Sequence, residues 1–321
     1  MIKTLSLFLM LFGASSVANA AEVTLRVADQ KGGMRAVLEA ANKLNQLPYH
    51  LQWTEFPAAA PLGEALNAGA VDAGIIGDAP LLFAQAGGAQ VKAIAVAKSN
   101  PYGTALLVNN NSPLKSARDL KGKSIATNRG SIGHFVALKA LASAGLTAKD
   151  VTFRYLPPAD AKLALSRGDV DVWATWEPYT AYAETQDHMR VLVNGRGLWS
   201  GNTFVAATDS ALADPAKRKA LQDFLQRLAS AQQWANQHPD AYSATLAKMI
   251  GFPVQAVKLS FTRKNMVWQP IDAATEAEQQ QTADFYHHSG LLPKALQVAP
   301  AFDRSFLLHS GGSQATSAAN H

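Results

Sequence analysis

The chain has 321 residues, of which 48% are apolar and 17% charged, with a formal net charge of +5. This length and the near-neutral mean hydropathy suit one large or two medium packed domains and exclude a bundle of membrane-spanning helices. The chain contains no cysteine, which excludes disulfides, a lipid-anchored N-terminal cysteine, a cysteine nucleophile and thiolate metal sites.

The N-terminus has the pattern of a secretory signal peptide. Lys3 precedes an apolar run over residues 5–12, and Ala18-Asn19-Ala20 forms a small-residue cleavage site. We therefore expect cleavage of residues 1–20, directly after Ala20, and a periplasmic protein. Residues 311–321 are small and polar without an apolar pattern, and we expect them to form a disordered tail.

The next part of the chain alternates short apolar runs with apolar residues at helical spacing. Strands are predicted over residues 23–28, 51–56, 71–76 and 91–97, and helices over residues 34–44 and 62–68 and from Leu81 onward. This β-α-β-α order with short loops predicts an α/β fold with a parallel or mostly parallel sheet covered by helices.

The same plan recurs later in the chain. Residues 65–72 (ALNAGAVD) align with residues 164–171 (ALSRGDVD), and this register places Asp78 opposite Glu177. Two similar α/β lobes explain such a repeat. After a strand-like segment at 203–208 the chain turns helical, with helices predicted over residues 217–237, 239–250, 253–261 and 274–289.

These observations predict two lobes joined by a hinge. We expect residues 21–105 to form the first part of lobe 1, residues 106–207 to form lobe 2, and residues 208–310 to return to lobe 1 as a mainly helical segment. The two crossings between the lobes are expected near residues 104–108 and 203–208, on either side of a cleft.

The stretch over residues 124–145 has the features of an anion site. A strand is followed by a loop with Gly130 and then by a helix that begins near His134 and stops at Gly145. Such a helix start directs free N–H groups and a positive dipole at a ligand, Ser131 adds a hydroxyl, and Gly133 allows close approach. An ordinary turn in which Ser131 caps the helix fits the same pattern.

Four strand ends of this kind are predicted, at residues 30–33, 78–80, 130–134 and 176–178, two in each lobe. Ligands of open α/β sheets bind beyond the carboxyl ends of the strands. Four positive helix ends around one cleft favour an anionic ligand.

Side chains near these points allow more than one role. Asp78 fits a helix N-cap or a ligand contact. Glu177 is a poor N-cap, and a position in the cleft fits it as well as a purely structural position does. Neither carboxylate is expected to touch an anion directly. Trp176 suits stacking on an apolar ligand tail or packing against the sheet. His134 suits a ligand contact or an ordinary hydrogen-bonded histidine.

Several other functions are disfavoured. Gly195 and Gly197 lead to a strand and not to a helix, which excludes the dinucleotide-binding pattern. His287 and His288 are adjacent and point to different helix faces, which disfavours a metal site. Scattered Lys and Arg residues give no nucleic-acid signal.

The chain resembles the periplasmic solute-binding proteins of ABC transporters for aliphatic sulfonates, taurine and nitrate, over nearly its whole mature length. The matching pieces are Gln30-Lys31-Gly32, Glu55-Phe56-Pro57-Ala58, Glu64-Ala65-Leu66-Asn67, Gly77-Asp78, Phe83-Ala84-Gln85-Ala86, Asp119-Leu120-Lys121-Gly122, Gly130-Ser131 with His134, Pro158-Ala159-Asp160-Ala161, Trp176 with Pro178-Tyr179, and Gln281-Thr282-Ala283-Asp284.

The resemblance implies a two-lobed type II periplasmic binding fold, no enzymatic activity, and delivery of the solute to a membrane permease. It places an organosulfonate head on the helix starts at residues 130–134 and 30–33, near Trp176. The family often has serines where Ile132 and Gly133 follow Ser131, and more often an aspartate where Glu177 stands. These departures leave a sulfate ester or a bulkier organosulfonate open as the solute.

The leading prediction is thus a monomeric binding protein without cofactor or metal. The alternative is a secreted hydrolase of sulfate esters that uses Ser131, His134 and Glu177 as catalytic groups. The candidate ligand-binding residues are Gln30, Gly32, Gly33, Asp78, Ala79, Ser131, Gly133, His134, Trp176 and Glu177.

Overall fold

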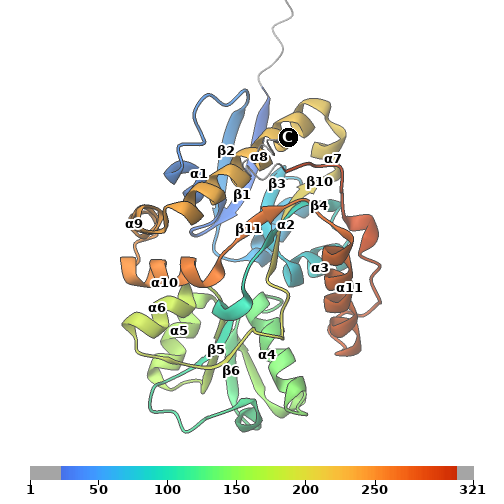
Figure 1. Cartoon of the computed structure of the whole chain (residues 1–321). Helices are drawn as coiled ribbons and strands as arrows, with labels where there is room; N and C mark the ends of the chain where they lie inside the picture. Colours follow the sequence, from blue (N-terminus) through green and yellow to red (C-terminus); the bar gives the residue numbers. More distant parts are fainter. Residues whose placement is uncertain (1–22, 309–321) are drawn as a thin grey trace, which may run out of the picture.

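The computed structural model describes residues 23–308, which form two lobes, each built around its own β-sheet (Figure 1). The first sheet contains β1 (Thr24–Gln30), β2 (His50–Phe56), β3 (Ala73–Gly77), β4 (Val91–Lys98), β10 (Asn202–Thr208) and β11 (Val267–Gln269). The second contains β5 (Ala105–Val108), β6 (Ser124–Thr127), β7 (Thr152–Tyr155), β8 (Val172–Thr175) and β9 (Arg190–Asn194). The predicted signal peptide and C-terminal tail lie outside the described residues.

Helices cover both sheets. The first lobe carries α1 (Met34–Ala40), α2 (Ala59–Asn67), α3 (Asp78–Ala86), α7 (Asp209–Ala213), α8 (Pro215–Gln237), α9 (Pro239–Ile250), α10 (Val254–Lys264) and α11 (Ala273–His288). The second carries α4 (Ile132–Ser143), α5 (Pro158–Arg167) and α6 (Tyr179–Gln186). Within residues 23–308, no helix combines the length and the apolar character that crossing a bilayer requires.

Both sheets are mixed, with most strands in one direction. The orders are β11-β4-β10-β3-β1-β2 and β7-β6-β8-β5-β9. Strand β1 pairs in parallel with β2 and β3, whereas β10 is inserted antiparallel between β3 and β4. In the second sheet β5 is antiparallel to β8 and β9. The predicted two-lobed α/β fold is therefore confirmed. The strands that follow the crossings, β5 and β10, run antiparallel to their neighbours, and so does the edge strand β11 beside β4.

The crossings themselves lie earlier in the chain than expected. The chain leaves the first sheet after Lys98 and enters the second at Ala105, and it returns between Asn194 and Asn202. The connecting segments are residues 99–104 and 195–201, and not 104–108 and 203–208. The expected limit of lobe 2 at residue 207 is also wrong, because β10 pairs with β3 and β4 in the middle of the first sheet.

The internal repeat has a structural counterpart. The carboxylate of Asp72 accepts the backbone N–H of Arg26 at the start of β1, and that of Asp171 accepts the N–H of Ser124 at the start of β6. In return, the N–H groups of Asp72 and Asp171 donate to the carbonyls of Arg26 and Ser124. The Val-Asp pair thus fixes the same strand junction in each lobe.

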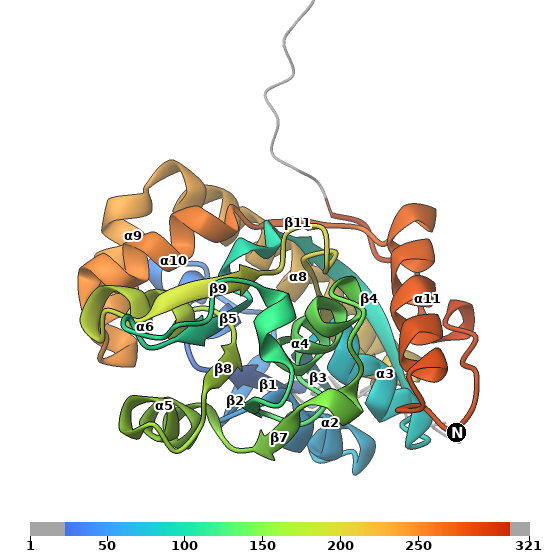
Figure 2. The same cartoon turned by 90° about the horizontal axis from the view of Figure 1, so that it is seen from below.

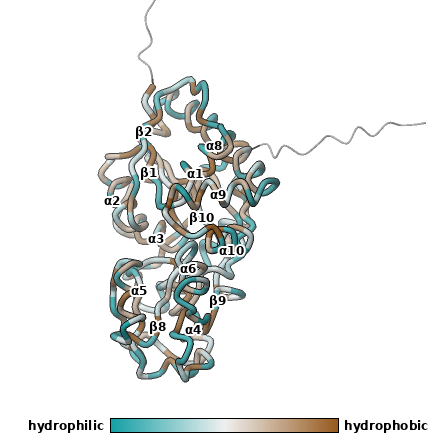
Figure 3. Tube along the Cα trace, turned by 90° about the vertical axis from the view of Figure 1, so that its left-hand side faces the viewer, coloured by the Kyte–Doolittle hydropathy of each residue, from teal (hydrophilic) through white to brown (hydrophobic). Residues whose placement is uncertain are grey.

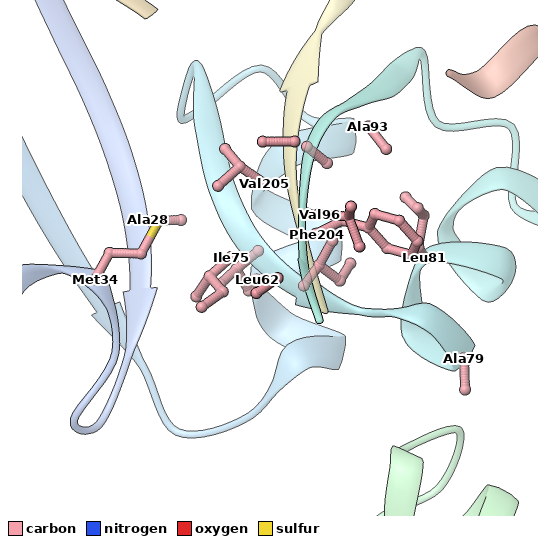
Figure 4. Close-up of a cluster of buried hydrophobic side chains, with 14 of the residues drawn as sticks. Ala28, Met34, Leu62, Ile75, Ala79, Leu81, Ala93, Val96, Phe204 and Val205 are labelled. Carbon is pink, nitrogen blue, oxygen red and sulfur yellow. The ribbon is translucent and has the colours of Figure 1, made fainter. Parts of the chain in front are cut away.

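Burial on both faces explains the composition of the central strands. Apolar side chains of β3, β4 and β10 form the core of the first lobe on both faces of the sheet (Figure 4). Ile75 pairs with Val205 on one face, and Phe204 pairs with Val96 on the other. Strands covered by helices on both faces are expected to read as nearly continuous apolar runs. A smaller core in the second lobe surrounds Trp173.

The C-terminal helices match the prediction closely, and one of them, α10, contacts both lobes. In the side view the lobes form two stacked bodies (Figure 3). Helix α10 lies between them and packs against α6 of the second lobe (Figure 1). Seen from below, α9 and α10 flank one side of the molecule and α11 the other (Figure 2).

Helix α1 ends at Ala40 and not at residue 44, since Asn42 adopts a left-handed φ of 54°.

Candidate functional site

A cavity of about 170 Å³ lies between the two lobes. Six of the ten predicted site residues line it: Gln30, Gly32, Gly33, Ser131, Trp176 and Glu177. The first lobe contributes the loop after β1 and the end of β3, and the second contributes the start of α4 and the loop after β8. Helix α10 closes the cavity with residues near its C-terminal end. The predicted gathering of strand ends around one cleft is therefore seen in the structure.

The start of α4 presents donors to this cavity. Ser131 is the N-cap, and its Oγ accepts the N–H of His134 at 3.1 Å, as predicted for a capping serine. The N–H of Ile132, the first residue of the helix, has no acceptor within residues 23–308. Gly130 supplies the left-handed φ of 71° that the preceding turn requires. Ser131 and Ile132 line the cavity, so this helix start is available to an anion.

Gly133 and His134 lie behind the cavity and do not line it. A side chain at Gly133 would place its Cβ 2.8 Å from the carbonyl oxygen of Ala174, so this glycine lets α4 pack closely on β8. The His134 Nδ1 accepts the N–H of Gly130 at 3.2 Å, and its ring packs edge-on against Phe153. Burial, with a smaller contribution from the charge of Arg129, lowers the pKa of His134 to about 4. Both residues therefore have structural roles, contrary to the sequence prediction.

The glycine loop after β1 lines the cavity, but its helix start is already occupied. The carboxylate of Asp29 accepts the N–H groups of Gln30, Met34 and Arg35 at 2.8, 3.0 and 2.8 Å. Burial raises the pKa of Asp29 to about 6, although these three hydrogen bonds oppose the shift. An internal carboxylate thus holds the positive end of α1, which sequence reasoning did not foresee. Gln30, Gly32 and Gly33 can contact a ligand, whereas the dipole of α1 is not free to bind a second anion.

Asp78 and Ala79 are buried away from the cavity. Asp78 is the first residue of α3, whose N-cap is Gly77, so the predicted capping role is also wrong. Its Oδ2 accepts the indole N–H of Trp199 at 2.6 Å, and its Oδ1 accepts the N–H of Ala79. Burial raises the pKa of Asp78 to about 7. Since Trp199 lines the cavity, Asp78 acts by positioning that side chain.

Glu177 lines the cavity and also joins the lobes. Its Oε2 accepts the N–H of Ala181 at 3.0 Å, and its Oε1 lies 3.2 Å from Nε of Arg263 on α10. Burial raises the pKa of Glu177 to about 7, with the charge of Arg263 opposing the shift. Beside it, Trp176 packs edge-on against Tyr179 and lines the cavity.

Two cationic residues that line the cavity were missed. Lys264 lies at the end of α10, and no carboxylate within residues 23–308 is at ion-pair distance from its Nζ. Burial lowers the pKa of Lys264, and the charge of Glu177 opposes this shift. Lys31 places its Nζ over the ring of Phe252 at 4.9 Å. The Arg-Lys pair at residues 263–264 has the pattern of an ordinary basic helix end, so no local signal marked Lys264 as a cavity residue.

The cavity can therefore bind an anion with an apolar part. The unpaired N–H at α4, the hydroxyl of Ser131 and the Lys264 ammonium suit a compact anionic head, and three tryptophans (Trp176, Trp199 and Trp268) add apolar surface. The geometry does not support acid–base chemistry between Ser131 and His134. The Ser131 hydroxyl bonds the backbone of His134 and not its imidazole, whose Nε2 is buried without a partner. The hydrolase hypothesis lacks its nucleophile–base pair.

Comparison with known proteins agrees with this geometry. Residues 46–252 match the family described as ABC transporter, phosphonate, periplasmic substrate-binding protein. The chain belongs to this family of ABC-transporter substrate-binding proteins. Within the family, it is 36% identical to a putative aliphatic sulfonates-binding protein of Escherichia coli K12 over 296 residues, covering 90% of this chain and 92% of the relative. A Bacillus subtilis 168 protein of the same description is 28% identical, with 80% and 77% covered.

Solved structures of substrate-binding proteins show the same two-lobed fold. The alkanesulfonate-binding protein SsuA from Xanthomonas axonopodis pv. citri, bound to MOPS, superposes with a TM-score of 0.82 at 35% identity, covering 89% of this chain and all of that one. The periplasmic aliphatic sulphonate binding protein SsuA from Escherichia coli gives 0.78 at 33% identity, covering 89% and 94%. The desulfurization enzyme DSZB shares the fold alone, at 16% identity and a TM-score of 0.67, covering 89% and 97%.

Proposed function

We propose that this substrate-binding protein captures an organosulfonate in the cavity between its lobes and delivers it to a membrane permease of an ABC importer. The observation that carries the proposal is the start of α4, where Ser131 and Ile132 line the same cavity as the ammonium of Lys264, and where no carboxylate of residues 23–308 pairs with that ammonium. The aliphatic-sulfonate-binding relatives support the same solute class.

The charges around the cavity favour a singly charged head. Lys264 is the one cation that we assign to the head, since Lys31 places its Nζ over the ring of Phe252, and the carboxyl group of Glu177 lines the same cavity. A sulfonate carries one negative charge at any physiological pH, whereas a phosphonate loses a second proton near neutrality. A second charge near Glu177 would be repelled, which favours sulfonates over phosphonates.

We assign the head to Ser131, Ile132 and Lys264, and the neighbouring contacts to Gln30, Gly32, Gly33, Trp176 and Glu177. Binding to both lobes would draw the protein toward its closed form, which is the form the permease would recognise. We further propose that the protein is periplasmic after cleavage of residues 1–20, acts as a monomer and catalyses no reaction.

Calorimetry with three ligands of equal chain length tests this function. Butanesulfonate should bind one-to-one and about tenfold or more tighter than butylphosphonate and pentanoate, because only the sulfonate combines three acceptor oxygens with a single charge. The recovered butanesulfonate should be chemically unchanged, with no sulfite released. Tighter binding of the phosphonate, or release of sulfite, would contradict the proposal.

A further inference from the structure

The lining that α1, α8, α9, α10 and β11 contribute to the cavity is largely apolar, with Gln232, Tyr242, Ser260 and Lys264 as its polar members. We call this part the tail chamber and define it by Val37, Leu228, Tyr242, Leu246, Phe261 and Trp268. These residues come from α1, α8, α9, α10 and β11, so five elements of one lobe enclose it. The charged residues that line the cavity lie elsewhere, on the loop after β1, in the second lobe and at the end of α10.

The tail chamber adjoins the loop that lines the head of the cavity. A Cβ built on Gly32 would lie 3.3 Å from Cδ1 of Leu246, so α9 packs directly on this loop. Gly32 has a left-handed φ of 73°, which favours glycine at this point of contact. Since the tail-chamber residues line the same cavity as Ser131 and Lys264, a ligand with its head there can direct its organic part toward the tail chamber.

The walls of the tail chamber suit a ring. Tyr242 and Phe261 pack edge-to-face with centroids 4.7 Å apart, and Trp268 adds a third aromatic surface. Aromatic walls of this kind gain most from a flat apolar guest. An apolar cavity of about 150 Å³ holds a benzene molecule, and the whole interlobe cavity, head site included, measures about 170 Å³, so one ring is the largest guest that the tail chamber can take.

One polar group in the tail chamber lacks a partner. Tyr242 is 4% exposed and lines the cavity, and its hydroxyl makes no hydrogen bond with another group of residues 23–308. The hydroxyl oxygen is not sealed off among the surrounding atoms, so it faces the space of the cavity. A substituent on the guest that exchanges a hydrogen bond with this hydroxyl would satisfy it.

We propose that the solute is a ring-bearing organosulfonate whose ring occupies the tail chamber and whose ring substituent hydrogen-bonds the Tyr242 hydroxyl. This inference rests on the function proposed above, because it takes the sulfonate head as given. It narrows the solute from organosulfonates in general to those with a polar-substituted ring.

Calorimetry on the wild-type protein tests the ring. Benzenesulfonate should bind about tenfold or more tighter than methanesulfonate, with a more negative heat-capacity change, since burial of a ring adds apolar contact that a methyl group cannot make. Equal affinities would overturn the inference and leave the sulfonate function intact. Absence of binding by any sulfonate would instead refute the proposed function itself.

A filled tail chamber provides the matched variant. Val37 belongs to the tail chamber, whereas Val254 on α10 is 50% exposed. Val37→Phe should weaken benzenesulfonate binding about tenfold and change methanesulfonate binding less than about twofold, while Val254→Phe should change neither. Retained methanesulfonate binding shows that the variant is folded. An unchanged affinity of Val37→Phe for benzenesulfonate would overturn the position of the ring.

The substituent is tested with Tyr242→Phe. This variant should bind 4-hydroxybenzenesulfonate about fivefold more weakly than the wild type does and bind benzenesulfonate at least as well, because only the hydroxylated ring loses a hydrogen bond. Equal effects on the two ligands would overturn the role assigned to Tyr242.

Discussion

The guanidinium Nε of Arg263 on α10 lies 3.2 Å from Oε1 of Glu177, at a point where the first lobe meets the second. Nη2 of Arg263 also binds Glu184 of α6 at 2.6 Å. The side chains of Arg263 and Glu177 are only 14% and 3% exposed. One arginine therefore ties the C-terminal helices to the second lobe beside the cavity.

The first prediction concerns this ion pair. At pH 8, above the pKa of about 7 of Glu177, Arg263→Met should lower the free energy of unfolding by about 2 kcal/mol, since it leaves Glu177 and Glu184 without their shared cation. The double variant with Glu177→Gln should recover part of the lost free energy of unfolding. Denaturant unfolding of the two single variants and the double variant measures the coupling. As a control, Arg35→Met removes the exposed partner of Glu39 and should cost less than about 1 kcal/mol. Additive losses at Arg263 and Glu177 would show that the pair is not coupled.

The second prediction concerns pH and Asp78. Its folded-state pKa of about 7 lies above that of an unfolded aspartate, so the folded protein binds more protons than the unfolded chain between pH 4 and pH 7. The contribution of Asp78 to stability is full below that window and is lost as the pH rises through it. In Asp78→Asn this decline should vanish. Urea unfolding between pH 5 and pH 8 should show the stability of the variant rising relative to the wild type, and parallel curves would contradict the assignment.

The third prediction separates packing from ligand contact at Gly133. Gly133→Ala should destabilise the protein by about 2 kcal/mol, because the new methyl group meets the carbonyl oxygen of Ala174 at 2.8 Å. Gly63→Ala in α2 is the matched control, since its methyl group would meet Ala84 and Ile76 at ordinary distances of 3.7 and 3.8 Å. It should be neutral or stabilising by up to about 1 kcal/mol. Thermal unfolding compares the two, and equal melting temperatures would refute the packing role.

The fourth prediction concerns the charge of Lys264. Lys264→Met should weaken butanesulfonate binding about tenfold or more and reduce its dependence on salt, because a sheltered cation next to the anion is lost. As a control, Lys258→Met on the same helix removes an exposed lysine that pairs with Asp240. This variant should bind butanesulfonate as tightly as the wild type does. Calorimetry at low and high salt measures the affinity of each variant and its dependence on salt. An equal effect of the two substitutions would show that the lysine acts only through net charge.

The sequence predicted the two lobes because their signal is local and periodic. The Val-Asp repeat at residues 71–72 and 170–171 marks the same strand junction twice, and Asp72 and Asp171 make matching backbone contacts there. Ser131 was predictable for the same reason, since a serine before an apolar helix is a frequent cap.

The other site residues depend on contacts between distant segments. Lys264 reaches the cavity only because the C-terminal helices return to the first lobe, and nothing in its neighbourhood shows this. Asp29 had a local signal, an acid a few residues ahead of a helix, which favours capping of α1 over an open anion site. Gly133 and His134 were misplaced because the pattern of a glycine turn does not reveal which side of the helix start faces the ligand.

A crystal structure of the protein grown with MOPS tests the central claim most directly. The account predicts the sulfonate at the start of α4, with its oxygens at hydrogen-bond distance from the Ser131 hydroxyl or the Ile132 N–H and from Nζ of Lys264. A sulfonate located outside the interlobe cavity, or held at the start of α1 in place of the Asp29 carboxylate, would contradict it.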